Sequence, residues 1–194
     1  GTDFCGWQKQ PDQRSVQEEV EKALGAVCAQ RVRINGAGRT DAGVHAYGQR
    51  ANFTAEFSIP VEKIPLAANA VLASAASEKK SRRTSGEAAI LAAEEVPADF
   101  HARFDAVGKK YIYKISNSQK PDPFQRNYCY QIGRKLDLDA MRQAAEHLPG
   151  TRDFKCFQAA GGRELETTVR TIYSARFIRP EAGMIRFEII GDGF

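Results

Sequence analysis

The chain has 194 residues, 42% of them hydrophobic and 27% charged, which is the composition of an ordinary soluble globular protein. This length can bury one substantial core, or two small cores that share a sheet. The formal net charge of +4 is compatible with a nucleic-acid partner but does not by itself demand one. No apolar run approaches the length of a transmembrane helix, so no membrane attachment is expected.

The four cysteines, at 5, 28, 129 and 156, are widely spaced and form no Cys-x-x-Cys pair. Free thiols in a reducing compartment such as the cytoplasm are the simplest interpretation. The three histidines, at 45, 101 and 147, do not combine with cysteine or glutamate at the spacing of metal ligands. We therefore expect no metal site.

Two helices and two strands are predicted in the first half of the chain. Ser15-Val16-Gln17-Glu18 is a capping box, and apolar residues then follow at helical spacing to about Cys28. Short apolar and alternating patterns predict strands over 31–35 and 49–57, and a helix is expected from Pro60 or Val61 to Leu72.

The second half repeats a similar order of elements. Alternation predicts a strand over 109–115, a short strand over 128–132 and a hairpin formed by 167–178 and 183–190. Asp137 can cap a helix that ends before Pro149-Gly150. The prediction is an α+β fold with two similar halves, 1–98 and 99–194, each an antiparallel sheet with helices on one face, as in ferredoxin-like or RRM-like folds.

The basic run from Lys79 to Arg83 lies in an alanine-, serine- and lysine-rich segment, 73–90. A solvated loop is the favoured interpretation, and a basic arm that touches phosphates is the functional alternative.

The loop from Gly36 to Ala46, flanked by the predicted strands, contains three glycines together with Arg39 and Asp41. A dinucleotide fingerprint would need glycine where Asp41 stands and a following helix, and a phosphate-binding P-loop would end in Gly-Lys-Ser/Thr. Neither pattern is present. A simple turn stabilised by Asp41 remains one interpretation, and a catalytic loop with one carboxylate and one guanidinium is the other.

The string Gly36-Ala37-Gly38-Arg39-Thr40-Asp41-Ala42-Gly43-Val44-His45-Ala46 resembles the signature of the tRNA pseudouridine synthase A family. Further matching motifs occur in the same order along the chain: Gly1 to Gln10, Ser15 to Glu18, Gly48-Gln49, Phe100 to Phe104, Lys110 to Tyr113, Asp153-Phe154 and Gly191 to Phe194. The resemblance implies the pseudouridine synthase fold, with the catalytic loop 36–46 in the first half.

The resemblance also implies roles for individual residues. Asp41 occupies the position of the family's catalytic aspartate, and Arg39 is the local guanidinium that would favour its ionised form or hold a phosphate. Tyr111 matches the active-site tyrosine, although Tyr111 and Tyr113 are also typical strand aromatics, and for Tyr113 a core role is preferred. Gly38 and Thr40 are further candidates for substrate contacts. His101 and Arg103 could contact the RNA backbone or simply cover the sheet edge.

The implied reaction isomerises uridine to pseudouridine at positions 38–40 of the tRNA anticodon stem-loop and needs no cofactor. The aspartate acts as a nucleophile or as a base on a nucleotide flipped out of its stack. Homodimers that grip tRNA are expected.

Family members also possess a strand before the Gly1 motif and a helix with a Met-Val-Arg motif after the last one, so the resemblance implies a fragment that lacks both ends. The segment 73–90 departs from the family pattern. Both features motivate the alternative of a catalytically inactive RNA-binding module.

Overall fold

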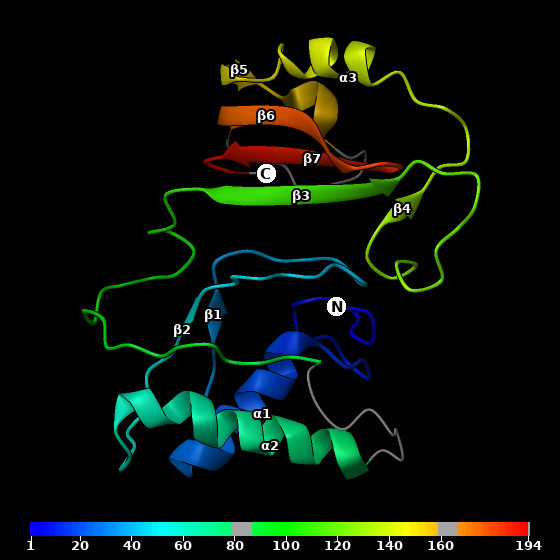
Figure 1. Ribbon diagram of the computed structural model, residues 1–194. Helices are drawn as coiled ribbons and strands as arrows, with labels where there is room; N and C mark the ends of the chain where they lie inside the picture. Colours follow the sequence, from blue (N-terminus) through cyan, green and yellow to red (C-terminus); the bar gives the residue numbers. More distant parts are fainter. Residues whose placement is uncertain (79–86, 159–166, 194) are drawn as a thin grey trace. The chain divides into compact units, whose positions relative to one another are not determined.

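The computed structural model describes residues 1–78, 87–158 and 167–193, in which the chain forms two compact units, Gly1–Asp105 and Ala106–Phe194. Both units combine helices with antiparallel strand pairs, which confirms the predicted α+β class (Figure 1). The boundary lies between Asp105 and Ala106, whereas the sequence placed it at 98/99. The basic run 79–83 lies outside the described residues. Within the described residues, no helix has the length and apolar character needed to cross a membrane.

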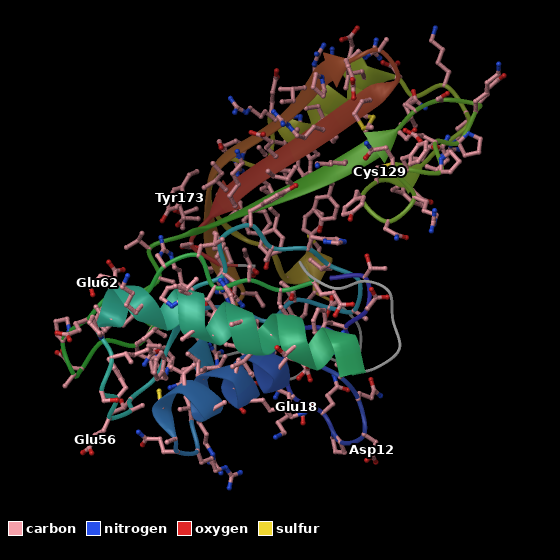
Figure 2. The ribbon with its side chains drawn as sticks, turned by 60° about the horizontal axis from the view of Figure 1, so that its bottom comes forward. Asp12, Glu18, Glu56, Glu62, Cys129 and Tyr173 are labelled. Atoms are coloured by element: carbon pink, nitrogen blue, oxygen red, sulfur yellow. The ribbon has the colours of Figure 1, made fainter. Side chains whose placement is uncertain are left out.

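The first unit contains helix α1 (Val16–Cys28), the short 3-10 helix η1 (Val61–Lys63) and helix α2 (Ile64–Glu78). The Ser15 hydroxyl caps α1 by accepting a hydrogen bond of 3.2 Å from the backbone N–H of Glu18, as the capping box predicts. The helix ends at Ala29, which adopts a left-handed conformation. Figure 2 shows that Glu18 and Glu62 lie on these helical elements.

The core of the first unit lies between the two helices and the extended segments. Its buried members, from both helices and from the segments around them, include Trp7, Ala23, Leu24, Cys28, Val32, Ile34, Ile64 and Ala68. The strands themselves are short: β1 (Asn35–Gly36) pairs antiparallel with β2 (Ala51–Asn52).

The strand lengths predicted for 31–35 and 49–57 are therefore wrong. The burial pattern behind that prediction is nevertheless present, since Phe53, Ala55 and Phe57 are half-buried against the core while Thr54 and Glu56 are exposed. Alternation reports which side chains face a core, and it does not require a hydrogen-bonded neighbour at every position.

The second unit is built on a five-stranded sheet in the order β4-β3-β7-β6-β5 (Figure 1). Its strands are β3 (Lys109–Ser116), β4 (Tyr130–Gln131), β5 (Gly150–Asp153), β6 (Val169–Glu181) and β7 (Met184–Gly191). The predicted hairpin corresponds to β6 and β7, which pair antiparallel. The edge strand β4 instead runs parallel to β3, and β5 has no counterpart among the predicted elements.

Helix α3 (Leu138–Ala145) packs on β6, and a second short 3-10 helix, η2, spans Lys155–Phe157. The Asp137 carboxylate caps α3 by accepting from the backbone N–H groups of Asp139 and Ala140 at 3.1 and 3.0 Å, which confirms the predicted helix start. Within the sheet, Ile185 of β7 is fully buried. The rings of Phe177 on β6 and Phe187 on β7 stack, with their centroids 4.4 Å apart.

Candidate active site

The candidate catalytic loop, 36–46, follows β1, and the chain after it leads into β2, which pairs with β1. Beyond that pair the ladder is extended by a backbone hydrogen bond of 2.8 Å from the Ala37 N–H to the Arg50 carbonyl. The Gln49 side-chain amide then donates to the Gly38 carbonyl at 2.5 Å. Both ends of the loop are thereby fixed to each other, which limits the conformations open to the residues between them.

The N-terminal segment packs against the same loop. The Trp7 N–H donates to the Thr40 carbonyl at 2.9 Å. A Cβ on Gly36 would lie 2.6 Å from the Trp7 ring, and one on Gly6, whose φ is +114°, would lie 2.6 Å from the Thr40 oxygen. Glycine is needed at both positions because no side chain fits so close an approach. Two motifs far apart in the sequence thus form one structural element.

Asp41 lies at the turn of this loop and is exposed. Its backbone carbonyl accepts from the Val44 N–H at 3.2 Å. Within the described part of the first unit, its carboxylate has no hydrogen-bond or ion-pair partner, and the same is true of the Arg39 guanidinium. The carboxylate is therefore not bound by the backbone amides of the turn, and Arg39 does not form an ion pair with it.

Asn52 connects the loop to the segment that carries His101 and Arg103. Its Nδ2 donates to the Phe100 carbonyl at 3.3 Å, and its Oδ1 accepts from the Ala102 N–H at 3.0 Å. Because Asn52 is also a member of β2, this segment lies beside the strand that closes the loop. The sequence analysis did not single out Asn52, because it occupies a polar position of the alternating pattern 49–57 and gives no signal of its own.

The side chains of that segment form a small aromatic and basic group. The rings of His101 and Phe104 have centroids 4.3 Å apart, and the Arg103 guanidinium lies 5.7 Å from the centroid of the Phe104 ring. His101 also accepts at Nδ1 from the Arg103 N–H at 3.2 Å. The first unit therefore brings Gly38, Thr40 and Asp41 together in one loop and holds the His101 and Arg103 segment against its base.

Tyr111 belongs to the second unit, where it pairs with Ile189 across β3 and β7 and is half-buried. Tyr113 lies two residues further along the same strand, with its ring centroid 6.3 Å from that of Phe187. At 59% exposure, Tyr113 is not the buried core aromatic that we expected.

The second unit also contains a buried carboxylate that the sequence analysis missed. Glu188 on β7 is only 3% exposed, and it accepts from Arg176 Nε at 3.1 Å and Nη2 at 2.8 Å. Lys110 Nζ lies 3.1 Å from the same oxygen, and Arg186 Nε lies 3.1 Å from the other oxygen without directing its N–H at it. The hydrogen bonds from Arg176 and then Lys110 lower the pKa of Glu188.

Among the described residues, no group of three or more histidine, cysteine, aspartate or glutamate side chains could hold a metal ion.

Comparison with known proteins identifies the family. The family profile described as tRNA pseudouridine synthase matches residues 1–105 and 144–194. These ranges include Asp41, His101 and Arg103, and the chain belongs to this family of isomerases.

Individual relatives match over the whole chain, including the stretch with Tyr111 that the profile leaves out. A tRNA pseudouridine synthase A of Clostridium acetobutylicum is 42% identical over 194 residues, which cover 100% of this chain and 74% of the relative. The protein of the same name from Halalkalibacterium halodurans is 42% identical, with 100% and 69% covered. That of Acetivibrio thermocellus is 40% identical, with 100% and 74% covered.

Proposed function

We propose that this protein converts uridine to pseudouridine at positions 38–40 in the anticodon stem-loop of tRNA. The observation that supports this most directly is the loop 36–46. It carries the family's sequence signature, it is fixed by contacts from Trp7 and Gln49, and it presents a carboxylate without a partner in the described part of its unit.

The reaction breaks the bond between N1 of uracil and C1′ of the ribose and forms a bond between C5 and C1′. A proton leaves C5 and one is taken up at N1, so the atoms and electrons balance without an oxidant, reductant or second substrate. The site therefore needs to extract the nucleotide, hold the ring while it turns, and supply a group that reacts at the sugar or removes a proton.

Asp41 is proposed as that group. An ionised carboxylate can add to C1′ as a nucleophile, or remove a proton from the ribose as a base in a glycal route. Both roles require an oxygen that is free to approach the substrate. The exposure of Asp41 and the lack of a side-chain bond within the described part of its unit are consistent with this requirement.

The other site residues are proposed to bind the substrate. Arg39 and Arg103 carry exposed guanidinium groups that can hold phosphate oxygens in a planar fork. Tyr111 can stack on the extracted uracil. His101 and the backbone of Gly38 and Thr40 would contact the nucleotide next to it.

An inactive RNA-binding module of the same fold is the second candidate. The observation that favours it is the lack of an ion pair between Arg39 and Asp41, since a cation beside the carboxylate is what would favour its ionised form. This candidate predicts that tRNA is bound without any pseudouridine being formed.

We further propose that the protein acts in the cytoplasm as a homodimer. The bacterial relatives named for tRNA modification and the free cysteines in the described part of the chain support the first statement. Light scattering on the purified protein tests the second: the mass of a dimer is expected, and that of a monomer would contradict it.

The modification map of cellular tRNA tests the proposed function. tRNA from a strain lacking the gene should contain unmodified uridine at positions 38–40, and expression of the gene should restore pseudouridine there. Restoration at other positions would contradict the anticodon assignment. Retention of tRNA by the purified protein with no restoration at any position would favour the inactive module.

A further inference from the structure

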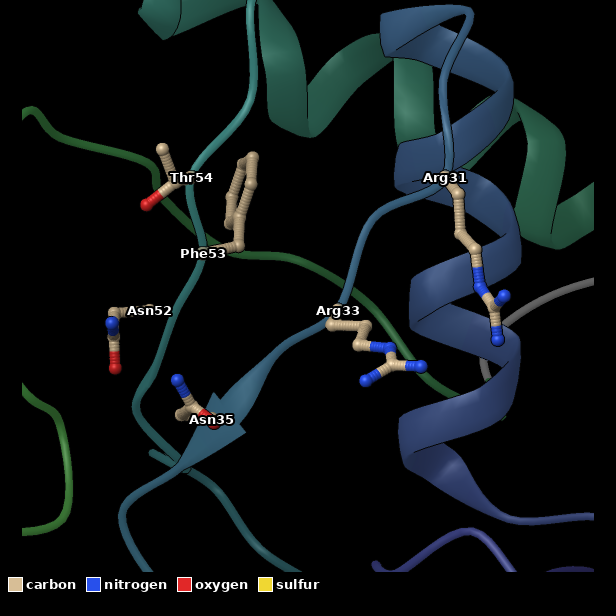
Figure 3. A pocket seen from close by; sticks show the side chains of 6 residues that line it. All are labelled: Arg31, Arg33, Asn35, Asn52, Phe53 and Thr54. Carbon is tan, nitrogen blue, oxygen red and sulfur yellow. The ribbon is translucent and has the colours of Figure 1, made fainter.

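A hollow of about 350 Å³ opens on the first unit where two extended segments diverge (Figure 3). It is lined by Arg31, Arg33 and Asn35 on one segment and by Asn52, Phe53 and Thr54 on the other. The β1–β2 ladder pairs only Asn35 with Asn52 and Gly36 with Ala51, so the segments are free to separate before it. The volume lies at the lower end of the range for small-ligand pockets, roughly 300–1,000 Å³.

Two of the residues that line this hollow, Arg31 and Arg33, are cations. Val32 and Ile34 are 3% exposed in the core, whereas Arg31 and Arg33 alternate with them and are exposed. Within the described part of the first unit, neither guanidinium has a hydrogen-bond or ion-pair partner. Figure 3 shows both side chains on the same side of their segment.

Two cations at or next to α1, by contrast, are paired. Lys22 on α1 lies 3.1 Å from Glu18 and 3.5 Å from Glu19, and Arg14 lies 2.6 Å from Glu87. These pairs at α1 contrast with the two arginines at the hollow, for which the described part of the first unit supplies no counter-charge. An anion is the ligand that such a pair favours.

The rest of the lining offers an aromatic surface and hydrogen-bonding groups. Phe53 is half-buried against the core, and its ring lies between the two segments (Figure 3). Asn35 and Thr54 make no side-chain hydrogen bond within the described part of the unit, whereas both ends of the Asn52 amide are occupied. The lining thus includes both cations and an aromatic ring, and single-stranded nucleic acid is bound by groups of these two kinds, through phosphate contacts and base stacking.

We propose that this hollow binds one RNA nucleotide that flanks the target uridine, with its phosphate on Arg31 and Arg33 and its base on Phe53. Asn35 is followed directly by Gly36 of the loop that carries Asp41, so the hollow adjoins the entrance of that loop. This inference rests on the proposed function, because it takes the substrate to be RNA.

The test is the binding and turnover of tRNA by the double variant Arg31→Ala/Arg33→Ala. The matched control is Lys22→Ala/Lys63→Ala, which removes the same charge from the helical elements of the same unit. Loss of one phosphate contact should weaken binding about tenfold and reduce the salt slope by about 0.7–1. Because neither arginine is proposed to touch the reacting atoms, KM should rise while kcat is retained.

Equal affinity and an equal salt slope for the double variant and the wild type would overturn the inference, as would an equal loss in the control. If the double variant is unfolded by circular dichroism, the single variant Arg33→Gln is compared with Lys63→Gln by the same criteria. A wild-type protein that binds tRNA but makes no pseudouridine would contradict the proposed function alone, since the binding comparison still decides the role of the hollow.

Discussion

The buried carboxylate of Glu188 should contribute measurably to the stability of the second unit. Replacing it by glutamine keeps its shape but removes the charge that holds Arg176 and Lys110 on the sheet of the second unit. The carboxylate accepts two bonds from Arg176, at 3.1 and 2.8 Å, and lies 3.1 Å from Lys110. Glutamine keeps one acceptor oxygen and places an NH₂ donor among the cations.

The expected loss can be worked from these contacts. A hydrogen bond to a charged group contributes about 1.5–3 kcal/mol, and one or two such bonds are lost. The side chains of Arg176 and Lys110 are 63% and 43% exposed, so both cations can return to water and the loss is reduced. We expect the unfolding free energy to fall by about 2 kcal/mol, or roughly 10 °C in Tm for a unit of this size.

The sign of the pH dependence follows from the lowered pKa of Glu188. A carboxylate whose folded-state pKa lies below its unfolded value stabilises the protein above that unfolded value, which is 4.5 for glutamate. The stabilisation is lost as the pH falls through the lower folded-state pKa. The difference in unfolding free energy between the wild type and Glu188→Gln should therefore be largest at neutral pH and should disappear in acid.

The assay is thermal unfolding followed by circular dichroism at pH 7 and at decreasing pH, with Glu181→Gln as the control. Glu181 is an exposed glutamate on a strand of the same sheet, and its replacement should leave Tm almost unchanged. A Glu188→Gln protein as stable as the wild type at pH 7 would refute the reasoning. So would a stability difference that persists undiminished in acid.

Three further predictions concern the first unit. Gly36→Ala should cost about 2 kcal/mol, because its Cβ would lie 2.6 Å from the indole ring, whereas Gly48→Ala meets nothing within 4 Å and should be neutral in thermal unfolding. Ser15→Ala should cost about 1 kcal/mol through loss of the α1 cap, and an unchanged Tm would contradict that capping role. Asn52→Ala should release the segment that follows Pro97 and expose it to limited proteolysis; a cleavage pattern identical to that of the wild type would show that the two hydrogen bonds do not hold it.

The elements with local signals were predictable from the sequence. The capping box at Ser15 and the cap at Asp137 gave both helix starts correctly, because a cap is formed by residues only three positions apart. The strand beginning at Lys109 was found because its alternation continues over the seven residues 109–115. The class of the fold followed from this order of elements.

Features that depend on distant residues could not be predicted in the same way. Alternation predicted the strand over 183–190, but the burial of Glu188 depends on Arg176 from β6, which lies opposite it, and on Lys110 from β3. Strand β5 could not be predicted because its sequence, Gly-Thr-Arg-Asp, has no periodic apolar pattern. All four of its residues are exposed.

The candidate site shows the same division. Asp41, Arg39 and the glycines of the loop were identified through the family resemblance. The packing of Trp7 against Gly36 and the two hydrogen bonds from the Asn52 side chain to the 100–102 backbone are long-range contacts, which have no local sequence signal.

The most direct test of the account is pseudouridine formation by the Asp41→Asn variant, measured together with its tRNA affinity. Asp12→Asn is the control. Asp12 is an exposed aspartate of the same unit, and asparagine also tolerates the positive φ that the backbone adopts at this position. We predict that Asp41→Asn binds tRNA with nearly the affinity of the wild type and forms no pseudouridine, while Asp12→Asn does both. Turnover by Asp41→Asn at the rate of the wild type would contradict the catalytic role of this carboxylate.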